Sequence, residues 1–119
     1  MSDDEWTKCW LTNVLGPKKY IETCMPTFNA NPEGGVVIIT SSIAAQRLGG
    51  SSMPYCVTKA AQVHMMKCVA STQGRKLRCN AVLPGLLLTD WGNEYGEERI
   101  NVLREAAALK QEVSCLGFG

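Results

Sequence analysis

The sequence predicts an α/β domain built on a parallel sheet. Residues 36–40 and 77–83 are short, largely apolar segments with the length of strands. Between them, residues 54–73 carry apolar side chains at helical spacing. A strand, a helix and a second strand in this order make one right-handed crossover between parallel neighbours. Two further helices, one before the first strand and one after the second, complete an α/β pattern.

The first helix is expected over residues 3–25. Acidic side chains at positions 3–5 place negative charge where the helix dipole is positive. Residues 29–35 contain asparagine, proline and two glycines, so they should form a loop. The strand over residues 36–40 is apolar throughout, which is typical of a strand covered on both faces.

The second half of the pattern follows the same logic. Residues 41–53 are rich in glycine, alanine and serine and should form a long loop. The next helix should end at Gly74, and its apolar face should consist of Val57, Ala60, Ala61, His64, Met65 and Cys68. A last helix is expected over residues 97–111. Because two strands leave both edges of a sheet open, we expect them to be part of a larger doubly wound sheet.

Composition excludes several classes of partner. The 119 residues are 45% hydrophobic and 19% charged, with a formal net charge of +1, as in soluble globular proteins. Without a basic cluster, no nucleic-acid partner is expected. No apolar leader follows Met1 and no apolar run approaches the ~20 residues of a membrane helix, so we expect a cytoplasmic protein without a membrane partner. Six cysteines without a C-x-x-C pair, together with one histidine, favour free thiols and no metal site.

Tyr55 and Lys59 are the first candidate catalytic pair. Four residues apart, they lie one above the other on a helix, where an ammonium favours the ionised phenol for proton exchange. The spacing alone also fits an amphipathic helix with an interfacial tyrosine and a solvated lysine. Ser41 and Ser42 follow the first strand, and in open α/β sheets ligands bind beyond the carboxyl ends of the strands. We therefore expect a hydroxyl, a phenol and an ammonium at one rim of the sheet.

These residues resemble the C-terminal half of the short-chain dehydrogenase/reductase family. The Y-x-x-x-K motif runs from Tyr55 to Lys59, and Ser42 lies thirteen residues before the tyrosine. Residues 80–89 have the pattern N-x-x-x-P-G-x-x-x-T, and Asn13 stands where a family helix supplies an active-site asparagine. The resemblance spans residues 4–113. It implies one partial Rossmann-like domain over residues 1–119, of which only the C-terminal portion is present and residues 113–119 form an atypical tail.

The resemblance implies an NAD(P)-dependent oxidoreductase that transfers hydride between the nicotinamide of NAD or NADP and a small carbonyl or alcohol substrate. Tyr55 would be the general acid/base and would contact the cofactor. Ser42 would bond the substrate oxygen, Lys59 the nicotinamide ribose, and Asn13 a water that links Lys59 to solvent. The remaining cofactor contacts would come from Pro84, Gly85 and Thr89. A homo-oligomer formed by the Asn13 and Tyr55 helices is also implied.

The helix of Asn13 carries an independent signal in Pro17. Because proline has no N–H, the Asn13 carbonyl loses its usual helical partner and could hold a relay water. An ordinary proline kink after Gly16 is the alternative interpretation.

The sequence departs from the family in one respect. None of its eleven glycines belongs to a G-x-G-x-x-G or T-G-x-x-x-G-x-G turn, which would cradle the pyrophosphate. A second functional hypothesis is therefore a catalytically inactive remnant that acts only by associating with full-length relatives.

Overall fold

The computed structural model describes residues 1–47 and 51–107, which divide into two units between Leu83 and Pro84. The first unit holds the sheet and the helices around it, namely α1 (Asp3–Trp10), the π-helical turn η1 (Leu11–Leu15), α2 (Gly16–Ala30), β1 (Gly35–Thr40), the 3-10 turn η2 (Ile43–Ala45), α3 (Met53–Gln73) and β2 (Leu77–Val82). The second unit holds α4 (Asp90–Asn93) and α5 (Glu97–Ala106).

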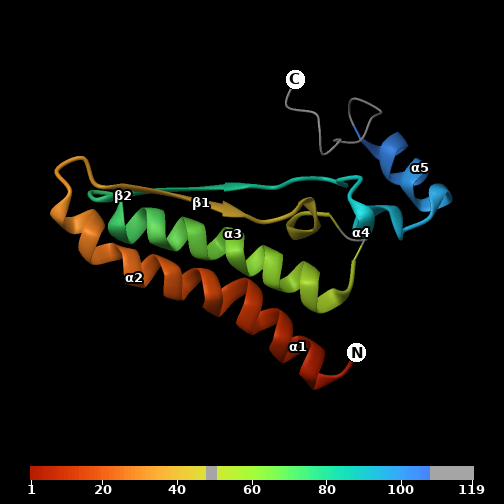
Figure 1. Ribbon diagram of the computed structural model, residues 1–119, viewed down its shortest axis with the longest axis horizontal. Coiled ribbons are helices and arrows are strands. Elements are labelled where there is room, and N and C mark those ends of the chain that lie inside the picture. The colour runs from red at the N-terminus through yellow and green to blue at the C-terminus, as the bar shows by residue number, and fades with distance from the viewer. Residues whose placement is uncertain (48–50, 108–119) are drawn as a thin grey trace. The chain divides into compact units, whose positions relative to one another are not determined.

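The two strands form a parallel pair, as predicted. Their register runs from Gly35 opposite Leu77 to Thr40 opposite Val82, and α3 connects them. In the first unit, the α1–α2 segment and α3 run side by side along one face of the sheet (Figure 1). The carboxyl end of β1 therefore meets the first turns of α3, where the candidate site lies.

Within the described residues of the first unit only one face of this sheet is covered, whereas the sequence predicted a strand covered on both faces. Along β1, Ile39 is buried whereas Val36 and Ile38 are 51% and 63% exposed. Side chains alternate across a strand, so the exposed ones form the face opposite to the helices.

The core of the first unit forms where α2 and α3 pack on the strands. Ile21, Ile39, Leu77 and Cys79 are its buried members. Met25 and Phe28 pack against them from the end of α2, and this burial outweighs the cost of Pro26 inside the helix.

Because of that packing, the helix continues to Ala30 and the predicted loop over residues 29–35 shrinks to 31–34. Asn31 builds the loop: its side-chain amide donates to the Gly34 carbonyl at 2.7 Å, and its side-chain oxygen accepts from the Glu33 N–H at 3.2 Å. Gly34 has φ 71°, and a Cβ there would lie 2.5 Å from the Lys76 carbonyl oxygen. Glycine is therefore required at this position.

The buried face of α3 differs from the predicted one. Val57, Ala60, His64 and Cys68 are exposed. The buried stripe consists instead of Pro54, Thr58 and Gln62, and Met65, Met66, Val69 and Ala70 pack against the core further along. In this orientation Thr58 faces η1, where the Asn13 amide donates a hydrogen bond to its buried hydroxyl.

The second unit is short. Helix α5 ends at Ala106, and Ala107 is extended with ψ 144°, so the predicted helix over residues 97–111 is too long. The rest of that prediction, and the tail over residues 113–119, lie outside the described residues. The turn α4 was not predicted; the Thr89 hydroxyl caps it by accepting from the Gly92 N–H at 3.1 Å.

In the described part of the chain, Cys9, Cys24, Cys56, Cys68 and Cys79 are free thiols. Cys115 lies outside it. Among the same residues, none of the helices has both the length and the apolar character needed to cross a bilayer.

Candidate active site

Two hydrogen bonds tie the carboxyl end of β1 to α3. The Lys59 ammonium donates to the Thr40 carbonyl at 3.0 Å, and the buried Ser41 hydroxyl donates to the Lys59 carbonyl at 2.8 Å. Ser41 is thus occupied with holding the strand to the helix, and Ser42 directly follows it. The two bonds fix the lysine at the rim where the strand ends.

Tyr55 and Lys59 lie on one face of α3, as their spacing predicts. The Lys59 ammonium is 5.5 Å from the centre of the Tyr55 ring. Both residues are half-buried. Burial lowers the pKa of the Lys59 ammonium below its ordinary value, because desolvation penalises the charged form. The pair therefore combines a phenol with a cation that the protein only partly shields from solvent.

Ser42 starts the turn after β1. Its side-chain oxygen accepts from the Ala44 N–H at 3.2 Å and so caps η2, which packs against α3. A hydroxyl that accepts one bond still has its own hydrogen to donate. Ser42 can therefore offer that hydrogen to a substrate oxygen at the same rim.

Asn13 reaches α3 through its side chain. Its amide nitrogen donates to the Thr58 hydroxyl at 3.0 Å, across 45 residues of sequence. Thr58 is fully buried, and its hydroxyl in turn donates to the carbonyls of Pro54 and Tyr55 at 2.8 and 3.0 Å. This contact links the helix of Asn13 to the turn that carries Tyr55.

The backbone around Asn13 forms a π-helical turn, whereas the sequence suggested a freed carbonyl or a kink. The Gly16 N–H donates to the Leu11 carbonyl, five residues back. Pro17, which has no N–H to give, then enters the first turn of α2. The π-turn widens the helix by one residue, so the backbone accommodates the proline and the helix continues without a break. The relay water stays a prediction.

The other predicted cofactor contacts belong to a different unit of the chain from this rim. Pro84, Gly85 and Thr89 belong to the second unit. Thr89 uses its oxygen to cap α4. At Gly85, a Cβ would meet no atom within 4 Å, so packing does not explain this glycine. Their roles at a nicotinamide remain predictions from the motif.

Comparison with known proteins shows to which family this chain belongs. The family model described as enoyl-(acyl carrier protein) reductase matches residues 1–115. The chain belongs to the short-chain dehydrogenase/reductase family. The predicted resemblance is thereby confirmed, and so is the partial Rossmann-like fold.

Individual short-chain dehydrogenase/reductase relatives are similar to this chain over most of its length. Dehydrogenase/reductase SDR family member 4 of Rattus norvegicus is 29% identical over 124 residues, covering 99% of this chain and 44% of its own. L-rhamnose 1-dehydrogenase (NAD(P)(+)) of Azotobacter vinelandii is 34% identical over 84 residues, covering 70% of this chain and 33% of its own. The chain therefore spans less than half the length of these curated relatives.

Solved structures share the fold. A 3-oxoacyl-[acyl-carrier protein] reductase of Brucella melitensis has a TM-score of 0.87 at 24% identity, covering 96% of this chain and 43% of its own. A reductase of the same description from that organism was solved with bound NAD. The relatives found are short-chain oxidoreductases, and a gluconate 5-dehydrogenase of Burkholderia cenocepacia was solved in complex with NADP and tartrate.

The described residues fit one end of such a dinucleotide. Lys59 offers a cation for ribose hydroxyls beside Tyr55. The first turns of α1 and α5 do not fit phosphates, because both are acidic and the start of α1 is closed by a capping box between Ser2 and Glu5. Among the described residues, Lys59 and Tyr55 are therefore the pair whose chemistry fits the ribose end of such a group.

Two buried residues escaped the sequence analysis. Thr58 lies between the motif tyrosine and lysine, and a β-branched hydroxyl inside that helix was the available signal. Gln62, one turn later, is also buried, and no feature of the apolar sequence around it indicated this burial. Both continue the stripe that begins with Pro54.

Proposed function

We propose that this chain carries the catalytic end of an NAD(P)-dependent oxidoreductase acting on a carbonyl/alcohol pair. The observation that supports this most directly is the Lys59 ammonium, 5.5 Å from the Tyr55 ring at the carboxyl end of β1. When bound, the nicotinamide would supply or accept the hydride. Free thiols suit a reducing compartment, and we place the protein in the cytoplasm.

The proposed proton chemistry uses groups of the first unit. Tyr55 gives the substrate oxygen a proton in reduction and takes one in oxidation. Ser42 donates its remaining hydroxyl hydrogen to that oxygen and so stabilises developing negative charge. Lys59 balances the phenolate and binds the nicotinamide ribose. Asn13 holds the water that returns protons from solvent to Lys59.

The motif residues of the second unit complete the proposal. Pro84, Gly85 and Thr89 would line the nicotinamide end of the cofactor. The substrate is proposed only as a small carbonyl or alcohol compound.

The test replaces Tyr55 by phenylalanine in a chimera that joins this chain to the cofactor-binding part of a full-length relative. Turnover should fall by at least ~10²-fold, the scale of a lost general acid, while cofactor binding is retained. Tyr20→Phe is the matched control, because that tyrosine is 76% exposed on α2. Near-parental turnover of the Tyr55→Phe chimera would rule out the proposed acid/base role.

The second candidate function, association without catalysis, is favoured by exposed apolar side chains on the two helices concerned. Trp10, Leu11 and Leu15 are 42%, 54% and 41% exposed at the end of α1 and in η1, and Val57 is 43% exposed on α3. Such surfaces favour partners. Copies of the chain, or full-length relatives, would bury these faces in a homo-oligomer or a mixed one.

Light scattering of the purified chain tests this association. Leu11→Glu and Val57→Glu should each shift the chain toward the monomer. Val102→Glu should leave the oligomeric state unchanged, since this valine is 64% exposed on α5 in the second unit. Oligomers that tolerate both charged substitutions would exclude these faces as the interface.

A further inference from the structure

One fully buried hydroxyl lies between the motif tyrosine and lysine of α3. Thr58 is 0% exposed, and its Oγ1 atom accepts a hydrogen bond from Asn13 Nδ2 at 3.0 Å. The same hydroxyl donates to the carbonyl oxygens of Pro54 at 2.8 Å and Tyr55 at 3.0 Å. Thr58 therefore contacts the backbone of the proposed acid/base residue and the side chain of the residue proposed to hold the relay water.

The chemistry of a hydroxyl group fixes the direction of these hydrogen bonds. A threonine hydroxyl has a single hydrogen, and the carbonyls of Pro54 and Tyr55 can only accept it. The lone pairs of Oγ1 are then left for Asn13, which must present the NH₂ end of its amide to α3 and keeps Oδ1 as an acceptor. Accepting the bond from Asn13 also polarises the hydroxyl and strengthens its donation to the carbonyls. The hydroxyl thus sets the orientation of the Asn13 amide.

Helix packing alone does not require a hydroxyl at this position. The α1–η1 segment and α3 run side by side (Figure 1), and valine has the same shape as threonine. Thr72, later on α3, makes the ordinary bond of a helical threonine to the carbonyl four residues back, but it lies exposed. Thr58 differs because its hydroxyl is buried and joins segments that are 45 residues apart in sequence. Burying a hydroxyl is costly unless it is paired, so its contribution lies in the groups that it connects.

We propose that Thr58 is a positioning residue of the reaction. It holds the first turn of α3 against η1, so that Tyr55 and Asn13 stay at fixed positions relative to each other. This inference rests on the proposed oxidoreductase function and adds a residue that the Y-x-x-x-K motif leaves unspecified. In this role Thr58 touches neither substrate nor cofactor and acts only through its two partners.

The expected effect follows from how precisely catalytic groups must be placed. A displacement of about 1 Å can lower a rate on the order of 10²-fold. In Thr58→Val the Lys59 ammonium keeps its bond to the Thr40 carbonyl, so α3 stays anchored to β1 and the displacement of Tyr55 should be smaller than that. We therefore expect kcat to fall roughly 5- to 50-fold and KM to change less than about twofold, because Thr58 does not contact the substrate.

The experiment uses the chimera with the cofactor-binding part of a full-length relative. Thr58→Val removes the hydroxyl, whereas Thr58→Ser keeps it and should retain kcat within about threefold of the parent. Gly34→Ala is the matched control for lost stability, because Gly34 precedes β1 at the end of the strand opposite to the catalytic rim. It should leave kcat unchanged at a temperature where circular dichroism shows every variant folded.

The outcomes separate this inference from the proposed function. A structural hydroxyl would make Thr58→Val behave like Gly34→Ala, less stable but equally active, and this result would overturn the positioning role. Equal losses of kcat in Thr58→Val and Thr58→Ser would overturn it too, because the hydroxyl would then not be the cause. If Tyr55→Phe abolishes turnover in either case, the proposed function stands while the positioning role fails. Near-parental turnover of Tyr55→Phe would overturn both.

A measurement on the purified chain needs no turnover and no Thr58 variant that folds poorly. Hydrogen exchange by NMR follows the side-chain NH₂ group of Asn13, assigned by its loss in Asn13→Ala. In the parent chain it should exchange at least about tenfold more slowly than that of Asn29, which lies exposed on α2. Thr58→Ser should keep this protection and Thr58→Val should lose it. Equal exchange of Asn13 and Asn29 in the parent would show that Thr58 does not hold Asn13, and would overturn the inference.

Discussion

The contact between Asn13 and Thr58 gives the sharpest test of how the site is held together. Thr58→Val keeps the shape of a fully buried side chain and removes its hydroxyl. The change deletes the acceptor of the Asn13 amide, at 3.0 Å, and the donor to the carbonyls of Pro54 and Tyr55. It thereby cuts the polar link between η1 and the turn of α3 that carries the tyrosine.

The expected magnitude follows from these bonds. An intramolecular hydrogen bond contributes about 0.5–1.5 kcal/mol, and a donor left unpaired in a partly buried site costs about 1–3 kcal/mol. Donation from the hydroxyl to the Pro54 carbonyl adds little, because the N–H of the same turn is directed to that carbonyl. We expect Thr58→Val to lower the free energy of unfolding by about 1–2 kcal/mol. Tm should fall by roughly 4–8 °C per kcal/mol in a domain of this size.

Urea unfolding followed by circular dichroism measures the loss, and a double-mutant cycle with Asn13→Ala isolates the pair. The two residues should couple by about 1 kcal/mol. Thr72→Val is the matched control: its hydroxyl makes the same bond to the carbonyl four residues back, Cys68, at 2.9 Å but lies exposed. That change should stay within about 0.5 kcal/mol. Additive effects of the Asn13 and Thr58 substitutions would show that this hydrogen bond does not hold the helices together.

Three further predictions concern charge, backbone and cofactor. Burial lowers the pKa of Lys59 from 10.5, so the free energy of unfolding should rise as pH increases through the folded value toward 10.5, and Lys59→Met should lack this component in pH-dependent urea titrations. Gly34→Ala should destabilise by at least about 1 kcal/mol in the same assay, because φ is 71° and the Lys76 carbonyl is 2.5 Å from the new Cβ. Calorimetric titration of the chain with NADH and NADPH should detect no binding, since the sequence holds no glycine-rich phosphate turn, and micromolar affinity would refute this.

The sequence was sufficient for elements that local chemistry determines. The apolar run of β1 and the glycine after Gln73 fix a strand and a helix end whatever surrounds them. The spacing of Tyr55 and Lys59 likewise places their side chains together on any helix. The parallel pairing of β1 and β2 could also be predicted, because a helix of 21 residues connects the two strands.

Tertiary packing decided what the sequence left open. Pro17 and Pro26 would each normally interrupt a helix, yet the segment continues to Ala30 because a π-turn accommodates the first proline and apolar packing of Phe28 retains the turn after the second. The orientation of α3 could not be predicted from periodicity either, since apolar side chains occur on several of its faces.

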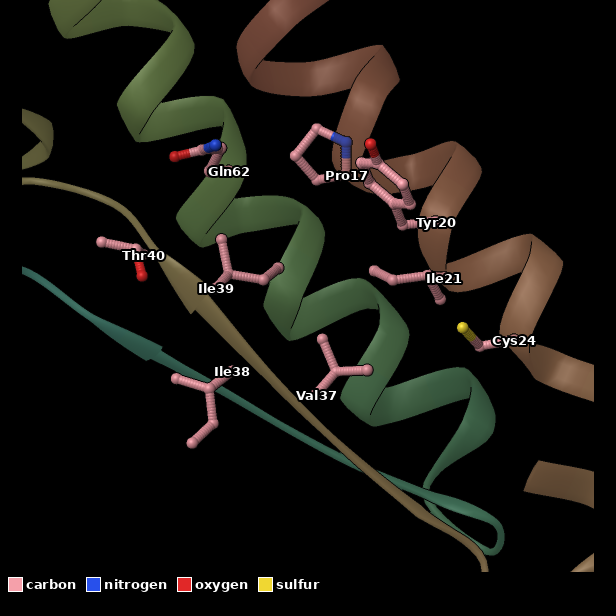
Figure 2. A pocket seen from close by; sticks show the side chains of 9 residues that line it. All are labelled: Pro17, Tyr20, Ile21, Cys24, Val37, Ile38, Ile39, Thr40 and Gln62. Carbon is pink, nitrogen blue, oxygen red and sulfur yellow. The ribbon is translucent and has the colours of Figure 1, made fainter. Parts of the chain in front are cut away.

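The buried stripe of α3 helps to hold the candidate site together. Thr58 and Gln62 are four residues apart, so they lie on one face of the helix, and both are buried. Thr58 meets Asn13 and has its hydrogen bonds satisfied within the chain. Gln62 lines a pocket beside β1, and among the described residues its oxygen has no hydrogen-bond donor (Figure 2). Because burying a polar group is favourable only when a partner is present, Thr58 strengthens the stripe through its hydrogen bond to Asn13, whereas Gln62 does not contribute in this way among the described residues.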